Sequence, residues 1–168
     1  MWNVQGTTVL NYLAAVDDCL IHNEVFEIFK SHAHYTSIVG MSSPSQAEEW
    51  IKRIREKESI HRRIEQFKKN DIVGKPALFD SKEYGLISPN TLRYINSLCD
   101  IHENFGNLND KNIVEIGIGY GGLCYILSTF YELNSYRLVD LPNVVLLATK
   151  YLNQLGVDNI EIERNKEE

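Results

Sequence analysis

One short stretch of the chain combines glycines with acids at spacings that suit a bound nucleoside. Glu115 stands two residues before Gly117, and glycine recurs at Gly119 and Gly121. Glycines lack a side chain, so a ligand can approach their backbone closely, and they permit positive φ angles. Further along the chain, Asp140 supplies a carboxylate that can accept hydrogen bonds from both hydroxyls of a ribose. The residue types therefore predict a nucleoside site that includes both acids.

The elements that must position these residues are predicted to alternate between strands and helices. Short apolar runs indicate buried strands, and apolar residues at three- and four-residue steps indicate helices. Gly156 is a plausible C-cap of the last helix. A strand-helix-strand-helix-strand order implies a parallel sheet, which binds ligands at the carboxyl ends of its strands. The expected strands are residues 112–116, 136–140 and 159–163, and the expected helices are residues 122–131 and 143–155.

The glycines alone leave two classes of ligand open. The G-x-G-x-x-G that begins at Gly117 matches the dinucleotide fingerprint of nicotinamide-binding folds. The E-x-G-x-G-x-G that begins at Glu115 matches the first motif of class I methyltransferases. Asp140 supports either class, because both place an acid at the end of the second strand. Two structural roles also stay open: Asp140 as the N-cap of the helix that Pro142 opens, and Glu115 as an ordinary turn acid.

The chain resembles class I S-adenosylmethionine-dependent methyltransferases over roughly residues 84–155. The blocks that carry the resemblance are KNIVEIGIGYGGL at residues 111–123 and YRLVDLP at residues 136–142, with ISPNTLRY at residues 87–94 leading into them. More narrowly, they are similar to the blocks of bacterial sugar O-methyltransferases, which join IVEIGxGYGG to a DLP after the second strand. The resemblance implies S-adenosylmethionine as cofactor, a saccharide or other small-molecule hydroxyl as methyl acceptor, and a role in polysaccharide modification.

The resemblance also implies roles for individual residues. Glu115 would face the amino group and sulfonium of the methionine part of the cofactor. Asp140 would hold the ribose, and Leu141 would pack near the adenine. Tyr120 would either face the cofactor or acceptor, or shield the turn as a packed aromatic side chain. The cofactor-binding residues implied in this way are Glu115, Gly117, Gly119, Tyr120, Gly121, Asp140 and Leu141.

No residue of the chain can be assigned as the catalytic base. Methyl transfer to a hydroxyl depends mainly on positioning, although a general base near the acceptor would help to remove the proton. His32, His34 and His102 are candidates, but surface or packing roles are more common for such histidines. His32 and His34 also lack a third ligand in view, so we predict no metal site.

The predicted sheet is incomplete for this family. From residue 112 onward the chain has room for about three strands, by the ~5–6 residues per strand typical of globular folds, whereas sheets of this family have about seven. We therefore expect an N-terminal fragment that is inactive as it stands. Its fold class would be α/β, with a helical N-terminal region (1–108) followed by an incomplete Rossmann-like parallel sheet (109–168). An uncovered edge of that sheet would favour aggregation.

The N-terminal region is predicted to be mainly helical and could serve as a lid, an acceptor-binding module or a homo-oligomer interface. The mixed charges of residues 52–69 favour a solvated helix face with i,i+4 pairs over a patch for polyanions. Helices are expected at residues 9–29 (with residues 23–30 either continuing or restarting the first helix), 44–69 and 90–105, a loop at 32–43 and an irregular connector at 77–87.

Composition argues against some classes of partner for the chain, and two further functions remain open. A formal net charge of -6 makes nucleic acid a poor partner. Three well-separated cysteines fit a reducing cytoplasm, and neither a signal peptide nor a membrane helix is apparent. Besides the methyltransferase, an NAD(P)-binding oxidoreductase fragment and a non-catalytic helical interaction module remain as hypotheses.

Overall fold

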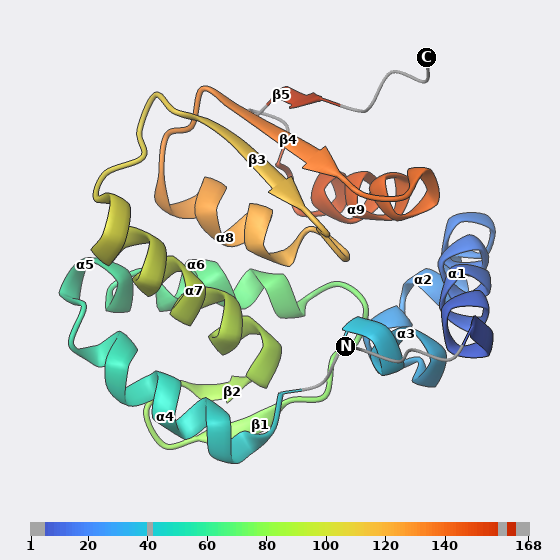
Figure 1. Ribbon diagram of the computed structural model, residues 1–168. Coiled ribbons are helices and arrows are strands. Elements are labelled where there is room, and N and C mark those ends of the chain that lie inside the picture. The colour runs from blue at the N-terminus through green and yellow to red at the C-terminus, as the bar shows by residue number, and fades with distance from the viewer. Residues whose placement is uncertain (1–5, 40–41, 158–160, 164–168) are drawn as a thin grey trace.

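The protein is an α/β molecule in which helices predominate (Figure 1). The computed structural model describes residues 6–39, 42–157 and 161–163 of the chain. A set of helices and a small hairpin precede a three-stranded parallel sheet with its own two helices. This order confirms the predicted α/β class, and it is compatible with part of a Rossmann-like fold.

The first helices match the predicted restart at residue 23 but differ from the predicted loop that follows. His22 is extended (φ -114°, ψ 113°) and divides the predicted helix. A helix also occupies residues 33–39 of the predicted loop, because Tyr35 is buried against aromatic rings of other elements; residues 40–41 of that loop lie outside the described residues. One buried residue in a short helix leaves no periodic pattern to detect. These elements are α1 (Gly6–Ile21), α2 (Asn23–Phe26), the 3₁₀ helix η1 (Phe29–Ser31) and α3 (Ala33–Val39).

The helix predicted at residues 44–69 begins where expected but is broken twice. Ser43 and Gln46 form a capping box, with Pro44 in the first turn. Lys57 and Arg63 leave the helical conformation, and the chain turns at each of them. These turns keep the apolar side chains of the segment buried, among them Ile54, Ile60 and Phe67. The resulting elements are α4 (Pro44–Arg55), α5 (Glu58–His61), α6 (Ile64–Phe67) and the 3₁₀ helix η2 (Lys68–Asp71).

The predicted irregular connector instead contains an antiparallel hairpin of β1 (Phe79–Ser81) and β2 (Gly85–Ile87). The Ser81 hydroxyl accepts hydrogen bonds from the amides of Glu83 and Tyr84 in its turn. The next helix, α7 (Pro89–Phe105), confirms the prediction for residues 90–105 and has Ser88 as its N-cap.

The sheet is parallel, as the alternation of elements predicted, and its strands lie in the order β3-β4-β5. Helices α8 and α9 cover one face of it (Figure 1). On the other face, the side chains of Val114 and Ile116 are 58% and 81% exposed. Residues 159 and 160 of the third predicted strand lie outside the described residues. The elements are β3 (Asn112–Ile116), α8 (Gly122–Phe130), β4 (Ser135–Val139), α9 (Pro142–Gln154) and β5 (Glu161–Glu163).

A single buried cluster joins the helical region to the helices of the sheet. Phe29 of η1 packs edge-on against Tyr120 and Tyr151, with ring centroids 5.6 Å and 6.3 Å away. The two parts predicted from the sequence therefore share one hydrophobic core.

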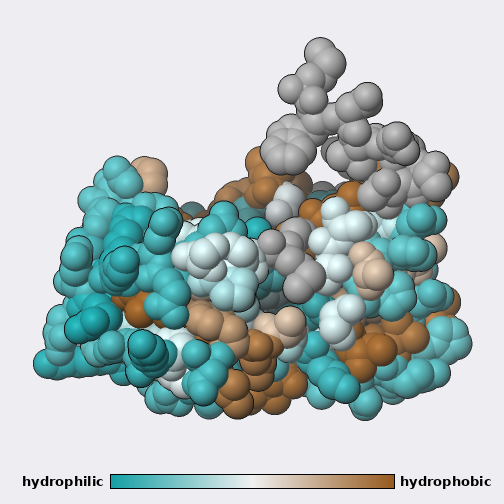
Figure 2. All heavy atoms as spheres, turned by 90° about the horizontal axis from the view of Figure 1, so that it is seen from below, coloured by the Kyte–Doolittle hydropathy of each residue, from teal (hydrophilic) through white to brown (hydrophobic). Residues whose placement is uncertain are grey.

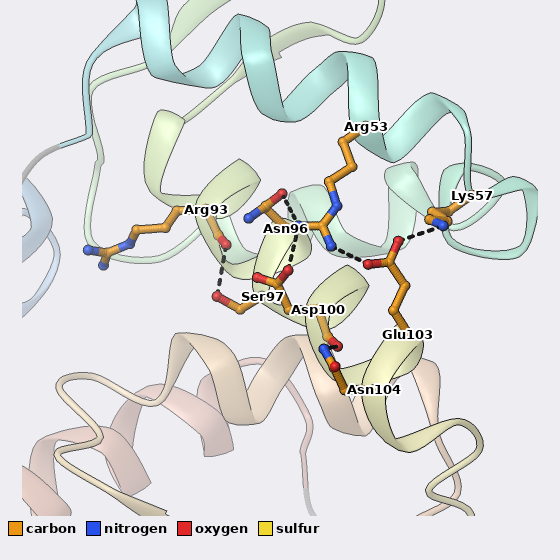
Figure 3. A network of polar contacts seen from close by, with 8 residues as sticks. All are labelled: Arg53, Lys57, Arg93, Asn96, Ser97, Asp100, Glu103 and Asn104. Atoms are coloured by element: carbon orange, nitrogen blue, oxygen red, sulfur yellow. Dashed lines mark hydrogen bonds and ion pairs between the residues drawn. The ribbon is translucent and has the colours of Figure 1, made fainter.

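The cations of residues 52–69 mostly pair with acids, but only Arg62 does so by the expected i,i+4 pairing, and the pairs of Arg53 and Lys57 reach α7. Arg53 of α4 contacts Asp100 and Glu103 of α7, both at 2.5 Å, and Lys57 contacts Glu103 at 2.6 Å (Figure 3). Figure 2 shows mainly hydrophilic side chains on the underside of the molecule, with apolar patches between them. Within the described residues, no helix is long and apolar enough to cross a membrane.

Candidate functional site

The glycine turn joins the end of β3 to the start of α8. Gly117, Gly119 and Gly121 all have positive φ angles (77°, 54° and 85°), as expected for a turn that favours glycine. A Cβ on Gly122 would lie 2.4 Å from the Tyr94 ring, so close packing excludes a side chain there. The turn therefore depends on its glycines for both conformation and space.

The backbone of the turn is approachable at its first two glycines. Among the described residues, chain neighbours aside, no atom lies within 4 Å of the position that a Cβ on Gly117 would take. At Gly119 the one such atom in the described part of the chain is Cγ1 of Val39, at 3.9 Å, from α3. The amide of Gly117 donates to the carbonyl of Val139 at 2.9 Å, which fixes the turn beside the end of β4. A ligand could therefore lie close to the turn, and α3 would be its neighbour.

Glu115 lies on the face of the sheet that the helices cover. The hydroxyl of Tyr136 donates to its Oε2 at 2.7 Å. Burial raises the pKa of Glu115 to about 7; the Tyr136 hydrogen bond opposes this, and the charge of Asp140 adds to it. Sequence reasoning missed Tyr136, although strand alternation places it on the same face as Leu138, the register partner of Glu115.

Asp140 follows β4 directly and lies beside the glycine turn, since Ile116 and Val139 are register partners. Its Oδ1 accepts a hydrogen bond from the amide of Leu141 at 2.7 Å. The N-cap of α9 is Leu141, with no side-chain cap, so Asp140 does not take the capping role considered for it. Leu141 itself is 51% exposed.

Tyr120 points into the core beneath the turn. It is 1% exposed, and its ring packs edge-on against Tyr94 and Tyr151, with centroids at 5.8 Å and 5.0 Å. Its hydroxyl accepts a hydrogen bond from the side-chain amide of Asn70 at 3.3 Å. Of the two roles considered for Tyr120, this position matches the packed aromatic side chain that shields the turn.

A buried lysine lies next to Tyr120, and sequence reasoning missed it. The Lys30 ammonium donates to the carbonyl of Asn70 and to the hydroxyl of Tyr151. It also lies 4.3 Å and 4.4 Å from the ring centroids of Tyr120 and Tyr151, a favourable cation–π geometry. Burial lowers the pKa of Lys30 to about 7, against the opposing charge of Asp71. Nothing in the local sequence marks this lysine as buried.

The three histidines considered as bases lie in different places. His102 Nδ1 is 2.9 Å from the hydroxyl of Tyr131, near the end of α8 opposite to the glycine turn, so its contacts are structural. His34 is exposed on α3. His32 Nδ1 is buried and has no hydrogen-bond partner among the described residues. No group of three or more potential metal ligands occurs in the described part of the chain.

One surface cavity of the described residues lies away from the turn. It has a volume of about 110 Å³ and is lined by the start of α4, the start of α7 and the segment before β1. Lys30 is part of its wall, whereas the glycine turn and Asp140 are not.

The carboxyl ends of β3 and β4 thus bring together Glu115, the open glycine turn and Asp140. One acid is desolvated beside a hydroxyl donor, and the other lies next to the turn. This arrangement can accept a cationic group and a pair of ligand hydroxyls. The chain matches no protein-family model, no curated protein and no solved structure.

Proposed function

We propose that the chain binds S-adenosylmethionine at the carboxyl ends of β3 and β4, as part of a methyltransferase acting on a sugar hydroxyl. The observation that carries the proposal is Glu115, an acid held by Tyr136 beside a glycine turn that is open at Gly117. A desolvated carboxylate at this point is stabilised by a cationic ligand group, which lowers its pKa. The ammonium and sulfonium of the cofactor are such groups.

In this proposal the residues of the chain bind and orient the cofactor. Glu115 faces the methionine part, and the turn lets the ligand approach the backbone. Asp140 accepts hydrogen bonds from the ribose hydroxyls, and Leu141 offers an exposed apolar surface to the adenine. Methyl transfer needs in-line approach of the acceptor hydroxyl, which is mostly a matter of positioning. The acceptor would be a saccharide, and the reaction would take place in the cytoplasm, where the buried free thiols persist.

A nicotinamide cofactor is the second candidate. Gly122 supports it, because the third glycine of a dinucleotide fingerprint serves close packing and a Cβ on Gly122 would meet Tyr94 and Tyr120. Glu115 opposes it, because its carboxylate would repel a pyrophosphate held at the same turn. The two candidate cofactors therefore differ in the charge of the group that would lie beside Glu115, which is positive in S-adenosylmethionine and negative in a dinucleotide.

Calorimetric titration with S-adenosylhomocysteine tests the proposal. We expect micromolar binding that Asp140→Ala and Glu115→Gln each weaken by about tenfold or more, the effect of one charge-assisted hydrogen bond. Asp80→Ala is the matched control, since Asp80 is an exposed acid on β1. Preference for NADH would favour the second candidate, and a folded chain that binds neither compound would refute both.

A further inference from the structure

Arg93 of α7 is a partly exposed arginine that pairs with no acid among the described residues. Its guanidinium lies over the ring of Tyr94, 5.0 Å from the ring centroid, and its Nη2 donates to the Tyr94 hydroxyl at 3.4 Å. Figure 3 shows this side chain extending away from the ion pairs of Arg53. A guanidinium is always charged and carries several N–H donors, so most of its hydrogen-bonding capacity is unused within the described chain.

Tyr94 places this guanidinium beside the glycine turn. Cε2 of Tyr94 lies 2.4 Å from the position that a Cβ on Gly122 would take, so the ring touches the backbone at the end of the turn. The same ring packs edge-on against Tyr120 of the turn, with the centroids 5.8 Å apart. Helix α7 packs along α8, which begins at Gly122 (Figure 1). Arg93 therefore lies one tyrosine ring away from the turn.

The acid of the candidate site lies at the other end of this turn. Glu115 comes two residues before Gly117, and Tyr136 donates to its carboxylate. Glu115 and Arg93 form no ion pair with each other in the described part of the chain. Desolvation raises the pKa of Tyr94, Arg93 opposes this, and the charge of Glu115 adds to it, so both charges act on one hydroxyl. The turn is thus flanked by an acid and a cation that remain available to a ligand carrying both charges.

We infer that Arg93 binds the carboxylate of the amino-acid end of S-adenosylmethionine, while Glu115 binds its ammonium. An α-amino acid carries these two groups on one carbon, so it matches an acid and a cation at one turn. A guanidinium can donate two parallel hydrogen bonds to a carboxylate, which makes the contact strong and directional. Tyr94 is then a positioning residue that holds the guanidinium toward the turn. The inference rests on the proposed S-adenosylmethionine site and assigns part of that site to the helical region.

Arg93→Gln in the full chain tests this role by titration with two compounds. One is S-adenosylhomocysteine, and the other is its decarboxylated analogue, which keeps the amine and the nucleoside. We expect the affinity for S-adenosylhomocysteine to fall about 10- to 100-fold, as for the loss of a charge-assisted contact. The affinity for the analogue should be no lower than in the wild type, which also shows that the variant is folded.

Arg62→Gln is the matched control. Arg62 is an exposed arginine that pairs with Glu58, so its loss should change the affinity for neither compound.

The outcomes separate this inference from the proposed function. Unchanged affinity of Arg93→Gln for S-adenosylhomocysteine, with binding still weakened by Asp140→Ala, would overturn the inference and leave the proposed function standing. An equal loss for both compounds would also overturn it, because Arg93 would then act on the nucleoside or on the fold. A wild-type chain that prefers NADH, or that binds none of these compounds, would overturn the proposed function and the inference together.

Discussion

At the scale of single residues, environment decides what Glu115 can do. Its usual pKa of 4.5 would leave it charged in any neutral solution, whereas burial raises the pKa to about 7. Near neutral pH the free protein therefore holds a mixture of the acid and the carboxylate. A cationic ligand selects the carboxylate, so binding below the pKa must release a proton.

The affinity for S-adenosylhomocysteine should therefore depend on pH through Glu115. We expect it to rise between about pH 6 and pH 8, by at most about tenfold per unit below the pKa, and then to level off. Calorimetry in buffers of different ionisation enthalpy would show the released proton directly. Glu115→Gln should bind more weakly with a flat profile, and a flat profile in the wild type would contradict the prediction.

At the scale of elements, α4 and α7 are joined by one arginine that serves several acceptors. Arg53 is 30% exposed; besides Asp100 and Glu103, it donates to the side chain of Asn96 at 3.1 Å. Figure 3 shows these groups converging between the two helices. Networks of this kind stabilise the folded state more than isolated exposed ion pairs do, because an exposed pair in water contributes little to the free energy of unfolding.

Arg53→Ala should lower the free energy of unfolding by about 1 kcal/mol, because it leaves three acceptors without their shared donor. Arg62→Ala is the comparison, since Arg62 makes a single i,i+4 pair with Glu58 and both side chains are well exposed. Its effect should stay within about 0.5 kcal/mol. Urea unfolding monitored by circular dichroism measures both, and equal effects would argue against a network.

At the scale of the whole molecule, one hydrophobic core spans the helical region and the sheet. Its members include three free cysteines in different parts of the fold: Cys19 on α1, Cys99 on α7 and Cys124 on α8. Burial raises the pKa of Cys19 and Cys99 to about 11, and it raises that of Cys124 further. The thiolate is the reactive form of cysteine. All three thiols are therefore protected from reaction, because they stay protonated and because they are packed in the core.

The three cysteines should react with a thiol reagent only when the core opens. In increasing urea, we expect all three to be labelled at the denaturant concentration at which circular dichroism is lost. Mass spectrometry of the labelled peptides distinguishes the sites. Labelling of Cys19 at lower urea, before Cys99 and Cys124, would mean that α1 to α3 open separately and that the core is not cooperative.

Local signals in the sequence determined the starts of α4 and α7, the parallel sheet and the glycine turn. The Ser-Pro pairs before α4 and α7 cap their helices with groups a few residues away. The apolar runs at β3 and β4, and the glycines between β3 and α8, likewise depend on near neighbours. With these elements, the sequence alone predicted that Glu115, the turn and Asp140 would share one edge of the sheet.

Only the tertiary structure decided what covers that edge and what lies beneath it. Several features of the fold are stabilised by distant partners, so the sequence shows no hydrophobic periodicity for them. They are the extra helix α3, the breaks after α1 and α4, and the β1-β2 hairpin. Lys30 is buried because Asn70 and Tyr151 solvate its ammonium, and Tyr120 turns inward onto the same groups. These contacts join residues far apart in the chain, so no local pattern of residue types encodes them.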